Sequence, residues 1–146
     1  TVETLFLGDS TDARLGTLDI PIGTTREIGA LPEQGGEFTG NAEGELWGFF
    51  PYLVPPAVIQ IAQDTGAEVR RFDLPTLDSM STAEGGEWAF AYFGHAFYIF
   101  YSVQPRDTST NVYRLDYDGT VTVRTPDTGM HIVGAGVSTC APIVLI

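Results

Sequence analysis

The stretch GGEWAFAYFGHAFYIFYS, Gly85 to Ser102, decides the fold, because it is the most apolar and aromatic part of the chain. The apolar run from Trp88 to Val103 has 16 positions (88 to 103), fewer than the about 20 that a membrane-spanning helix needs. Aromatic and β-branched residues fill the run and Gly94 interrupts it, which disfavours any helix. We therefore predict two paired strands, Trp88–Phe93 and Ala96–Val103, joined by a turn at Gly94-His95.

A second copy of this unit lies fifty residues upstream, where GGEFTGNAEGELWGFF runs from Gly35 to Phe50. The two stretches align without a gap. The matched pairs include Glu37 with Glu87, Phe38 with Trp88, Gly44 with Gly94, Trp47 with Phe97 and Phe50 with Phe100. The centre of the upstream copy is plainly a polar turn. The upstream copy is therefore also predicted to be a hairpin, with one strand over 38–42 and the other over 46–50.

Three further hairpins are predicted around these two. ARLGTLDIPIGTTREIGALP, AVIQIAQDTGAEVRRFDLP and NVYRLDYDGTVTVRTP each contain a strand, a turn with Gly23, Gly66 or Gly119, and a second strand. Asp118-Gly119 is the strongest turn signal, since this pair accepts the positive φ of a tight hairpin turn.

The copies divide the chain into three repeats of four strands, at about 10–51, 57–103 and 111–146. Pro-rich PYLVPPA and polar QPRDTST connect them. The third repeat is incomplete, and the strand at Glu3–Asp9 is predicted to complete it and to cover an exposed edge. The predicted fold is thus a single all-β domain of three antiparallel, blade-like repeats.

These residues resemble a family pattern. Strands ending in Leu-Asp, turns with Thr-Gly or Asp-Gly, a Leu-Pro, a Gly-led strand and an aromatic-rich last strand resemble the blades of bacterial NHL- and YVTN-like β-propellers, most closely at TLFLGDSTDARLGTLD, Thr4 to Asp19. The chain is also similar to the repeat domain of secreted or surface proteins of myxobacteria. The resemblance implies an extracytoplasmic protein that is secreted or displayed on the cell surface.

One departure from the family concerns closure, because propellers have four to eight blades and this chain supplies three. Either two copies form a dimer that closes a six-bladed ring, or the three repeats pack in another way. The main alternative is a β-trefoil, which also builds one domain from three repeats.

Charge excludes some partners. Seven arginines and no lysine face nineteen acidic residues, and the formal net charge is −12. Such a surface repels phosphate backbones and anionic lipids, so we expect neither nucleic acid binding nor membrane insertion. Cys140 is the only cysteine, so no disulfide can form within this chain.

Glu37 and Glu87 are the first candidate site residues, because they follow glycine and precede a large aromatic in both copies. Paired carboxylates can bind a cation or act as acid and base on a glycoside, although solvated residues at strand starts are the more common case. Of the two histidines, His95 is expected to be solvated in a turn, and His131, which aligns with Trp88, is expected to replace a core aromatic.

Asp116 and Asp118 are candidate calcium ligands, because Asp-x-Asp-Gly opens many calcium loops. A complete EF-hand loop is missing, and a hairpin turn also explains these residues. We therefore predict no required cofactor, with calcium as the alternative.

Aromatic side chains are the remaining candidates. Alternation places Trp88, Phe90 and Tyr92 on one face of a strand, where core packing is favoured for Trp88 and Trp47. Aromatics left at the surface can stack on a sugar ring or a peptide, and Tyr52, beside the Pro-rich connector, is expected to be exposed. The predicted ligand contacts are Trp47, Tyr52, Trp88, Tyr98, Glu37 and Glu87.

The predicted function is a non-enzymatic binding or scaffolding module for a carbohydrate, a peptide or a protein. Two other classes stay open. One is a hydrolase of glycosides or lactones that uses Glu37 and Glu87; the other is a structural subunit whose edge strands, Glu3–Asp9 and Ala141–Ile146, join copies into a ring or filament.

Overall fold

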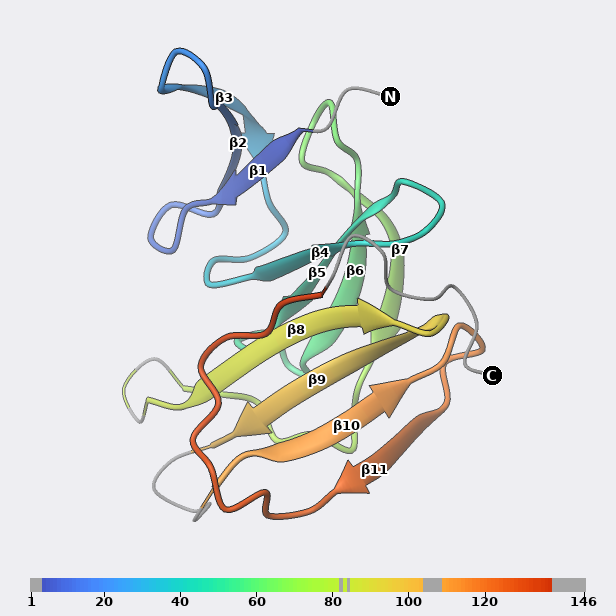
Figure 1. The fold of residues 1–146 in the computed structure, drawn as a ribbon. Coiled ribbons are helices and arrows are strands. Elements are labelled where there is room, and N and C mark those ends of the chain that lie inside the picture. The colour runs from blue at the N-terminus through green and yellow to red at the C-terminus, as the bar shows by residue number, and fades with distance from the viewer. Residues whose placement is uncertain (1–3, 82, 84, 104–108, 138–146) are drawn as a thin grey trace.

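The computed structural model describes residues 4–81, 83, 85–103 and 109–137. Within them the chain is all-β, with eleven strands in three antiparallel sheets and no helix (Figure 1). The predicted all-β class is therefore confirmed. In the same residues, no helix is long and apolar enough to cross a membrane.

The three sheets follow one another along the chain, and each is built from consecutive antiparallel strands. Sheet A has the order β1 (Leu5–Gly8), β2 (Arg14–Asp19), β3 (Thr24–Ala30). Sheet B has the order β4 (Glu37–Gly40), β5 (Leu46–Phe50), β6 (Ala57–Ile61), β7 (Glu68–Asp73). Sheet C has the order β8 (Glu87–Phe93), β9 (Ala96–Ser102), β10 (Asn111–Leu115), β11 (Val121–Thr125).

The predicted hairpins all form. β8 pairs with β9 from Glu87↔Ser102 to Phe93↔Ala96, so Gly94-His95 is a two-residue turn. Both turn residues have positive φ, +57° and +63°, as a tight turn between twisted strands requires. The upstream copy, β4 with β5, closes through the longer polar loop 41–45. Gly23, Gly66 and Gly119 also have positive φ in the turns where they were predicted.

The four-stranded sheets each combine parts of two predicted repeats. β5 pairs with β6 across the Pro-rich connector, and β9 pairs with β10 across the second connector. Each of these sheets thus joins the last two strands of one repeat to the first two of the next. β1 pairs with β2; the predicted pairing of Glu3–Asp9 with the C-terminal repeat involves residues 138–146, which lie outside the described residues.

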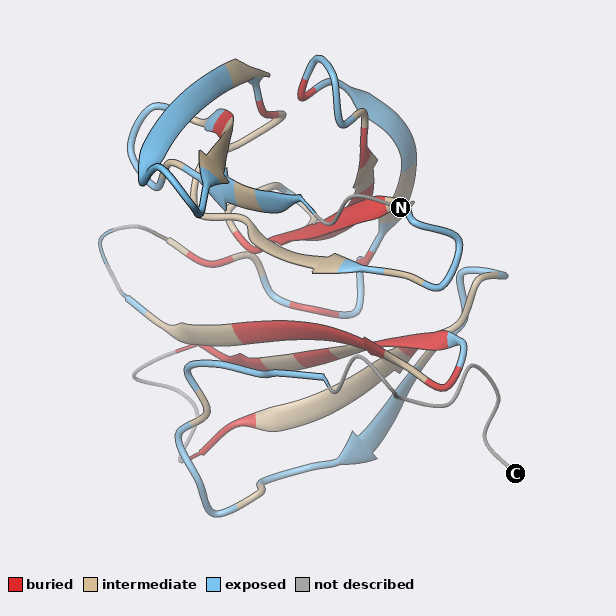
Figure 2. Cartoon of the chain, turned by 45° about the horizontal axis from the view of Figure 1, so that its top comes forward, coloured by how far each residue is buried: buried red, intermediate tan, exposed pale blue. Residues whose placement is uncertain are grey.

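The core lies between the sheets because β5 is buried on both of its faces. Trp47 and Phe49 point into a cluster with sheet C, whereas Leu46 and Phe50 point into a cluster with sheet A. A continuous apolar run is the sequence pattern of such a strand. Buried residues accordingly gather in the central strands (Figure 2). Each large side chain that is fully buried contributes about 1.5–3 kcal/mol.

Candidate functional site

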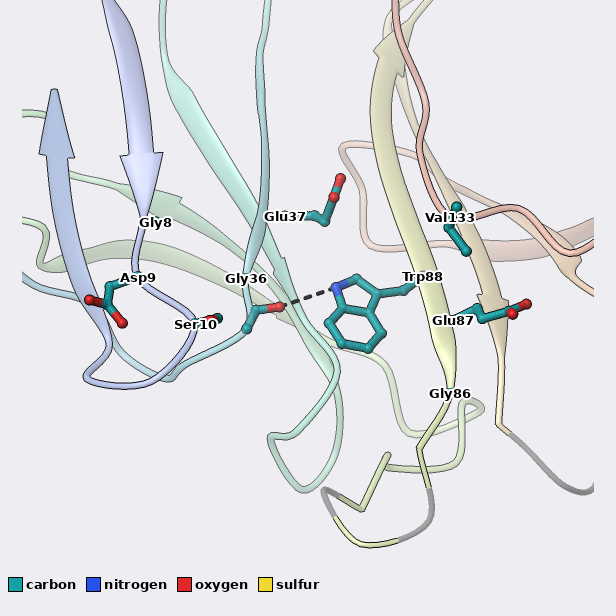
Figure 3. A pocket seen from close by; sticks show the side chains of 10 residues that line it. Gly8, Asp9, Ser10, Gly36, Glu37, Gly86, Glu87, Trp88 and Val133 are labelled. Atoms are coloured by element: carbon teal, nitrogen blue, oxygen red, sulfur yellow. Dashed lines mark hydrogen bonds between the residues drawn. The ribbon is translucent and has the colours of Figure 1, made fainter. Parts of the chain in front are cut away.

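The candidate site is a pocket of about 330 Å³ where the three sheets meet. It lies at the end of β1 and at the starts of β4 and β8 (Figure 3). Its lining comprises Gly8, Asp9, Ser10, Gly35, Gly36, Glu37, Gly86, Glu87, Trp88 and Val133. Both predicted glutamates and one predicted aromatic are therefore brought together, although they lie fifty positions apart in the sequence.

Strand geometry explains how the two copies reach the same pocket. Glu37 and Glu87 are the first residues of β4 and β8, and these two strands lie side by side. Successive side chains of a strand point to opposite faces, so Trp88 and Glu87 point in opposite directions from β8 (Figure 3). The indole Nε1 of Trp88 donates a hydrogen bond to the Gly35 carbonyl at 3.1 Å, which ties sheet C to sheet B.

Tyr52 packs against this indole. The two rings meet edge to face, with centroids 5.5 Å apart. Tyr52 is half-buried instead of fully exposed as predicted, because its ring covers Trp88. Trp88 is half-buried as well and presents part of its ring to the pocket.

The Glu37 carboxylate lies in a partly dehydrated environment. Burial raises the pKa of Glu37, while a hydrogen bond from the Phe90 backbone opposes this shift. Within the part of the chain that the structure describes, no salt bridge involves Glu37. The site therefore holds a carboxylate that lacks a protein cation among these residues.

Glu87, in contrast, is paired. His131 Nδ1 lies 2.8 Å from Glu87 Oε2, and the His131 side chain is 52% exposed. The prediction that His131 replaces a core aromatic is wrong, because residues 131–137 form no strand and the imidazole meets a carboxylate at the surface.

A buried threonine holds the segment that carries His131 in place. The Thr110 backbone N–H donates to the Met130 carbonyl at 2.8 Å, and the Ile132 N–H donates to Thr110 Oγ1 at 2.8 Å. Thr128 also donates to the Thr110 carbonyl. These bonds direct the segment after β11 past β8 (Figure 1) and bring Val133 to the pocket.

Two predicted ligand contacts lie elsewhere. Trp47 has no exposed surface and packs against Phe72 and Phe97, with ring centroids 5.8 Å and 4.9 Å away. It therefore belongs to the core, which the alternation pattern favoured, and offers no area to a ligand. Tyr98 is half-buried on β9 and does not line the pocket.

The candidate calcium ligands serve their own hairpin. Asp116 Oδ1 accepts hydrogen bonds from Arg114 at 2.6 and 2.9 Å, and Asp118 Oδ1 accepts one from the Thr120 backbone at 2.8 Å. Among the residues that the structure describes, no group of three or more His, Cys, Asp or Glu side chains could hold a metal. The hairpin turn accounts for both aspartates.

The sequence reasoning missed Asp9 and Val133 as pocket residues. Asp9 Oδ1 accepts hydrogen bonds from the Thr11 and Asp12 backbones at 2.7 and 3.0 Å, which lower the pKa of Asp9 together with nearby Arg14. An aspartate whose side chain accepts hydrogen bonds from the backbone N–H groups two and three residues later forms an Asx turn. The sequence around Asp9 does not indicate that this turn lies beside β4.

A second polar cluster was also missed, at the opposite ends of β4 and β8. Asn41 Nδ2 donates to Tyr117 Oη at 2.7 Å, and the His95 ring stacks on Tyr117 with centroids 5.1 Å apart. Burial raises the pKa of Tyr117 to about 12. His95 is exposed as predicted, but it packs on a neighbouring hairpin instead of pointing freely into solvent.

Comparisons with known proteins add no family. No protein-family model matches the chain, and a search of curated proteins finds no significant match.

Proposed function

We propose that this protein is a non-enzymatic binding module and that the pocket at the meeting point of the three sheets holds part of its ligand. The observation that carries this proposal is the half-buried carboxylate of Glu37, which faces the pocket without a protein cation among the described residues. A partly buried carboxylate that no cation neutralises costs stability even with one backbone hydrogen bond, and a ligand that hydrogen-bonds to it recovers part of that cost.

The pocket chemistry favours a carbohydrate, a peptide or a segment of a protein. Three carboxylates, from Asp9, Glu37 and Glu87, line it, so we expect hydroxyl, amide or cationic groups in the ligand and no anionic ones. The partly exposed indole of Trp88 supplies an apolar surface on which a sugar ring or an aliphatic side chain can pack. An extracytoplasmic location is part of the same proposal and follows from the family resemblance.

An array experiment tests this function. The wild-type chain is applied to immobilised neutral glycans, acidic glycans and peptides, together with Glu37→Gln and, as a matched control, Glu43→Gln, which lies in an exposed loop. We expect binding to neutral glycans or peptides that is at least about tenfold weaker for Glu37→Gln, the equivalent of about 1.4 kcal/mol, and unchanged for Glu43→Gln. Binding that Glu37→Gln leaves unchanged, or binding to acidic glycans alone, would contradict the proposal.

A second candidate function is hydrolysis of glycosides or lactones. The observation in its favour is that two carboxylates share a pocket but differ in environment: burial raises the pKa of Glu37, whereas Glu87 is paired with His131. Carboxylates whose environments differ in this way can act as acid and base. The test measures turnover of nitrophenyl glycosides and of a simple lactone. Turnover by the wild type that is abolished in both Glu37→Ala and Glu87→Ala would support this function over binding alone.

For the fold, we propose that the three sheets are propeller-like blades and that two copies close a six-bladed ring. In sheets B and C the four strands lie side by side in the order in which they occur in the sequence. The three described strands of sheet A lie in sequence order as well. Apolar clusters join sheet A to sheet B and sheet B to sheet C, as in successive blades. The β-trefoil remains the alternative, and the mass in solution discriminates between them.

A further inference from the structure

The side chains that line the pocket between the three sheets are rich in hydrogen-bond acceptors and poor in donors. Its charged side chains are the carboxylates of Asp9, Glu37 and Glu87, which only accept hydrogen bonds when they are ionised. The side-chain donors among the lining residues are Ser10 and Trp88, and the indole N–H of Trp88 already donates to a backbone carbonyl of the protein. A ligand that mainly donates hydrogen bonds therefore suits these side chains best.

Two of the three carboxylates are already compensated by the protein. Asp9 Oδ1 accepts two backbone hydrogen bonds, and Asp9 Oδ2 lies 3.4 Å from Arg14 Nη2. Glu87 Oε2 lies 2.8 Å from His131 Nδ1. Glu37 accepts one backbone hydrogen bond and forms no salt bridge with any residue in the described part of the chain. Glu37 is thus the carboxylate whose charge a ligand can neutralise.

The Trp88 indole offers this ligand a ring surface and no free polar atom. Its Nε1 donates to the Gly35 carbonyl at 3.1 Å, and Tyr52 packs edge to face against the ring. In Figure 3 the Trp88 side chain projects from β8 toward β4, and the Glu37 side chain projects from β4 toward β8. The part of the ring that lines the pocket is a π surface, and such a surface attracts cations.

A guanidinium group has the properties that this pocket requires. It carries five N–H donors and no acceptor, its planar fork matches a carboxylate, and its flat face stacks on an aromatic ring. A sugar hydroxyl accepts as well as donates, and the lining side chains supply few donors for it. A lysine ammonium is more strongly hydrated than a guanidinium, so its transfer to a half-buried carboxylate costs more.

The size and the rim of the pocket also suit one arginine side chain. Its volume of about 330 Å³ lies at the lower end of the range of roughly 300–1,000 Å³ that is typical of ligand sites. Val133 lines the pocket and is 70% exposed, so its methyl groups can contact the methylene stem of a long basic side chain. The net charge of −12 favours the approach of a basic partner.

We propose that the pocket binds an arginine side chain of a partner protein, with the guanidinium paired to the Glu37 carboxylate and packed against the Trp88 ring. The inference rests on the proposed binding function and narrows its ligand from a carbohydrate, peptide or protein to a segment that presents arginine.

A nuclear magnetic resonance titration of the full chain tests the proposal. The probe is acetyl-arginine amide, and its control is acetyl-citrulline amide, which has nearly the same shape but no charge. The indole N–H signal of Trp88 reports on the pocket, whereas that of Trp47, which has no exposed surface, reports on general effects. We expect a saturable shift of the Trp88 signal with the arginine compound, a Kd at least about tenfold higher with the citrulline compound, and no shift of the Trp47 signal.

Two matched variants identify the carboxylate that the ligand uses. Glu37→Gln should weaken binding of the arginine compound about tenfold or more. Glu43→Gln removes the same charge from an exposed loop and should leave binding unchanged. An unshifted Trp47 signal shows that Glu37→Gln is folded. The citrulline comparison uses the wild type alone, so it tests the proposal even if this variant does not fold.

The outcomes separate this inference from the function on which it rests. Equal binding of the arginine and citrulline compounds, or an arginine effect that a folded Glu37→Gln leaves unchanged, would overturn the arginine assignment. Glu37-dependent binding of a neutral methyl glycoside alone would also overturn it but would keep the proposed binding function. Absence of any Glu37-dependent binding, both in this titration and on the array, would contradict both.

Discussion

At the scale of single residues, burial separates the aromatics that hold the fold from those that can meet a ligand. Trp47, which aligns with Phe97 in the other sequence copy, is fully buried, whereas Trp88, which aligns with Phe38, is half-buried at the pocket. The Trp47 Nε1 donates to Glu45 Oε2 at 3.1 Å, so its polar atom is satisfied inside the protein. Trp47 is therefore a structural residue, whereas Trp88 can serve both packing and recognition.

Replacing Trp47 should strongly destabilise the protein. Trp47→Ala leaves a cavity beside Phe72 and Phe97, and we expect it to lower the free energy of unfolding by about 3–5 kcal/mol. The control is Val54→Ala at a side chain that is 86% exposed, with an expected change within about 0.5 kcal/mol. Denaturant unfolding followed by circular dichroism measures both, and a loss below about 1 kcal/mol in Trp47→Ala would show that its packing is replaceable.

Glu37 should make stability depend on pH. Its pKa is raised in the folded state above the ordinary value of 4.5, so between these two values the folded state binds more protons than the unfolded state. The stability associated with the neutral carboxyl is complete below about pH 4.5 and is lost as the pH rises through the folded-state pKa.

Glu37→Gln removes this titration. We expect the melting temperature of the wild type to decrease relative to that of Glu37→Gln as the pH rises from 4 to 7, because glutamine does not ionise. Glu43→Gln is the control for a general effect of charge. Parallel melting curves for wild type and Glu37→Gln over this range would contradict the expected environment of Glu37.

At the scale of elements, tight backbone contacts hold neighbouring sheets in register. A Cβ added to Gly29 on β3 would lie 2.1 Å from the carbonyl oxygen of Thr65, in the turn between β6 and β7. Backbone atoms cannot move aside as a flexible side chain can, so only glycine permits sheets A and B to approach this closely. The same turn uses the positive φ of Gly66.

Gly29→Ala should weaken the contact between sheets A and B. We expect a loss of about 1–3 kcal/mol in the free energy of unfolding, the usual effect of overpacking. Gly134→Ala is the matched control, because a Cβ at Gly134 meets nothing within 4 Å. Chemical denaturation of both variants measures the difference, and equal stability would mean that sheet A adjusts its position freely.

The elements themselves were largely predictable, because their signals are local. Glycines at the turns, together with alternating or continuous apolar runs on either side, identified each hairpin. The assignment of hairpins to sheets was not predictable from these signals. β5 pairs with β6, although the Pro-rich connector between them has the composition of a boundary between two repeats. Which hairpins share a sheet depends on where the connector directs the chain.

At the scale of the whole molecule, sheet A carries exposed apolar side chains in the part of the chain that the structure describes. Its exposed apolar side chains include Leu5 and Leu7 on β1 and, in the turn after β2, Ile20 and Ile22, which are 70% and 73% exposed. Sheet B, in comparison, is covered by sheet A on one face and by sheet C on the other. An exposed apolar surface of this kind is suited to association.

We expect the protein to form a dimer through this surface at micromolar concentration, with twice the chain mass of 15.8 kDa. The double variant Ile20→Asp with Ile22→Asp should sediment as a monomer, since it places charges in the apolar contact. Val69→Asp is the control at an exposed position on β7 of sheet B. A monomeric wild type would contradict the dimer and the six-bladed ring.

The sequence by itself determined the strands, their turns and the repetition of Gly-Glu-aromatic at the starts of β4 and β8, because these depend on residues close together in the chain. Only the tertiary structure decided that Glu37, Glu87 and Trp88 share a pocket with Asp9, and that His131 pairs with Glu87 instead of entering the core. The physical reason is that hairpin formation is local, whereas a pocket forms where separate sheets pack, and packing depends on the complementarity of distant faces.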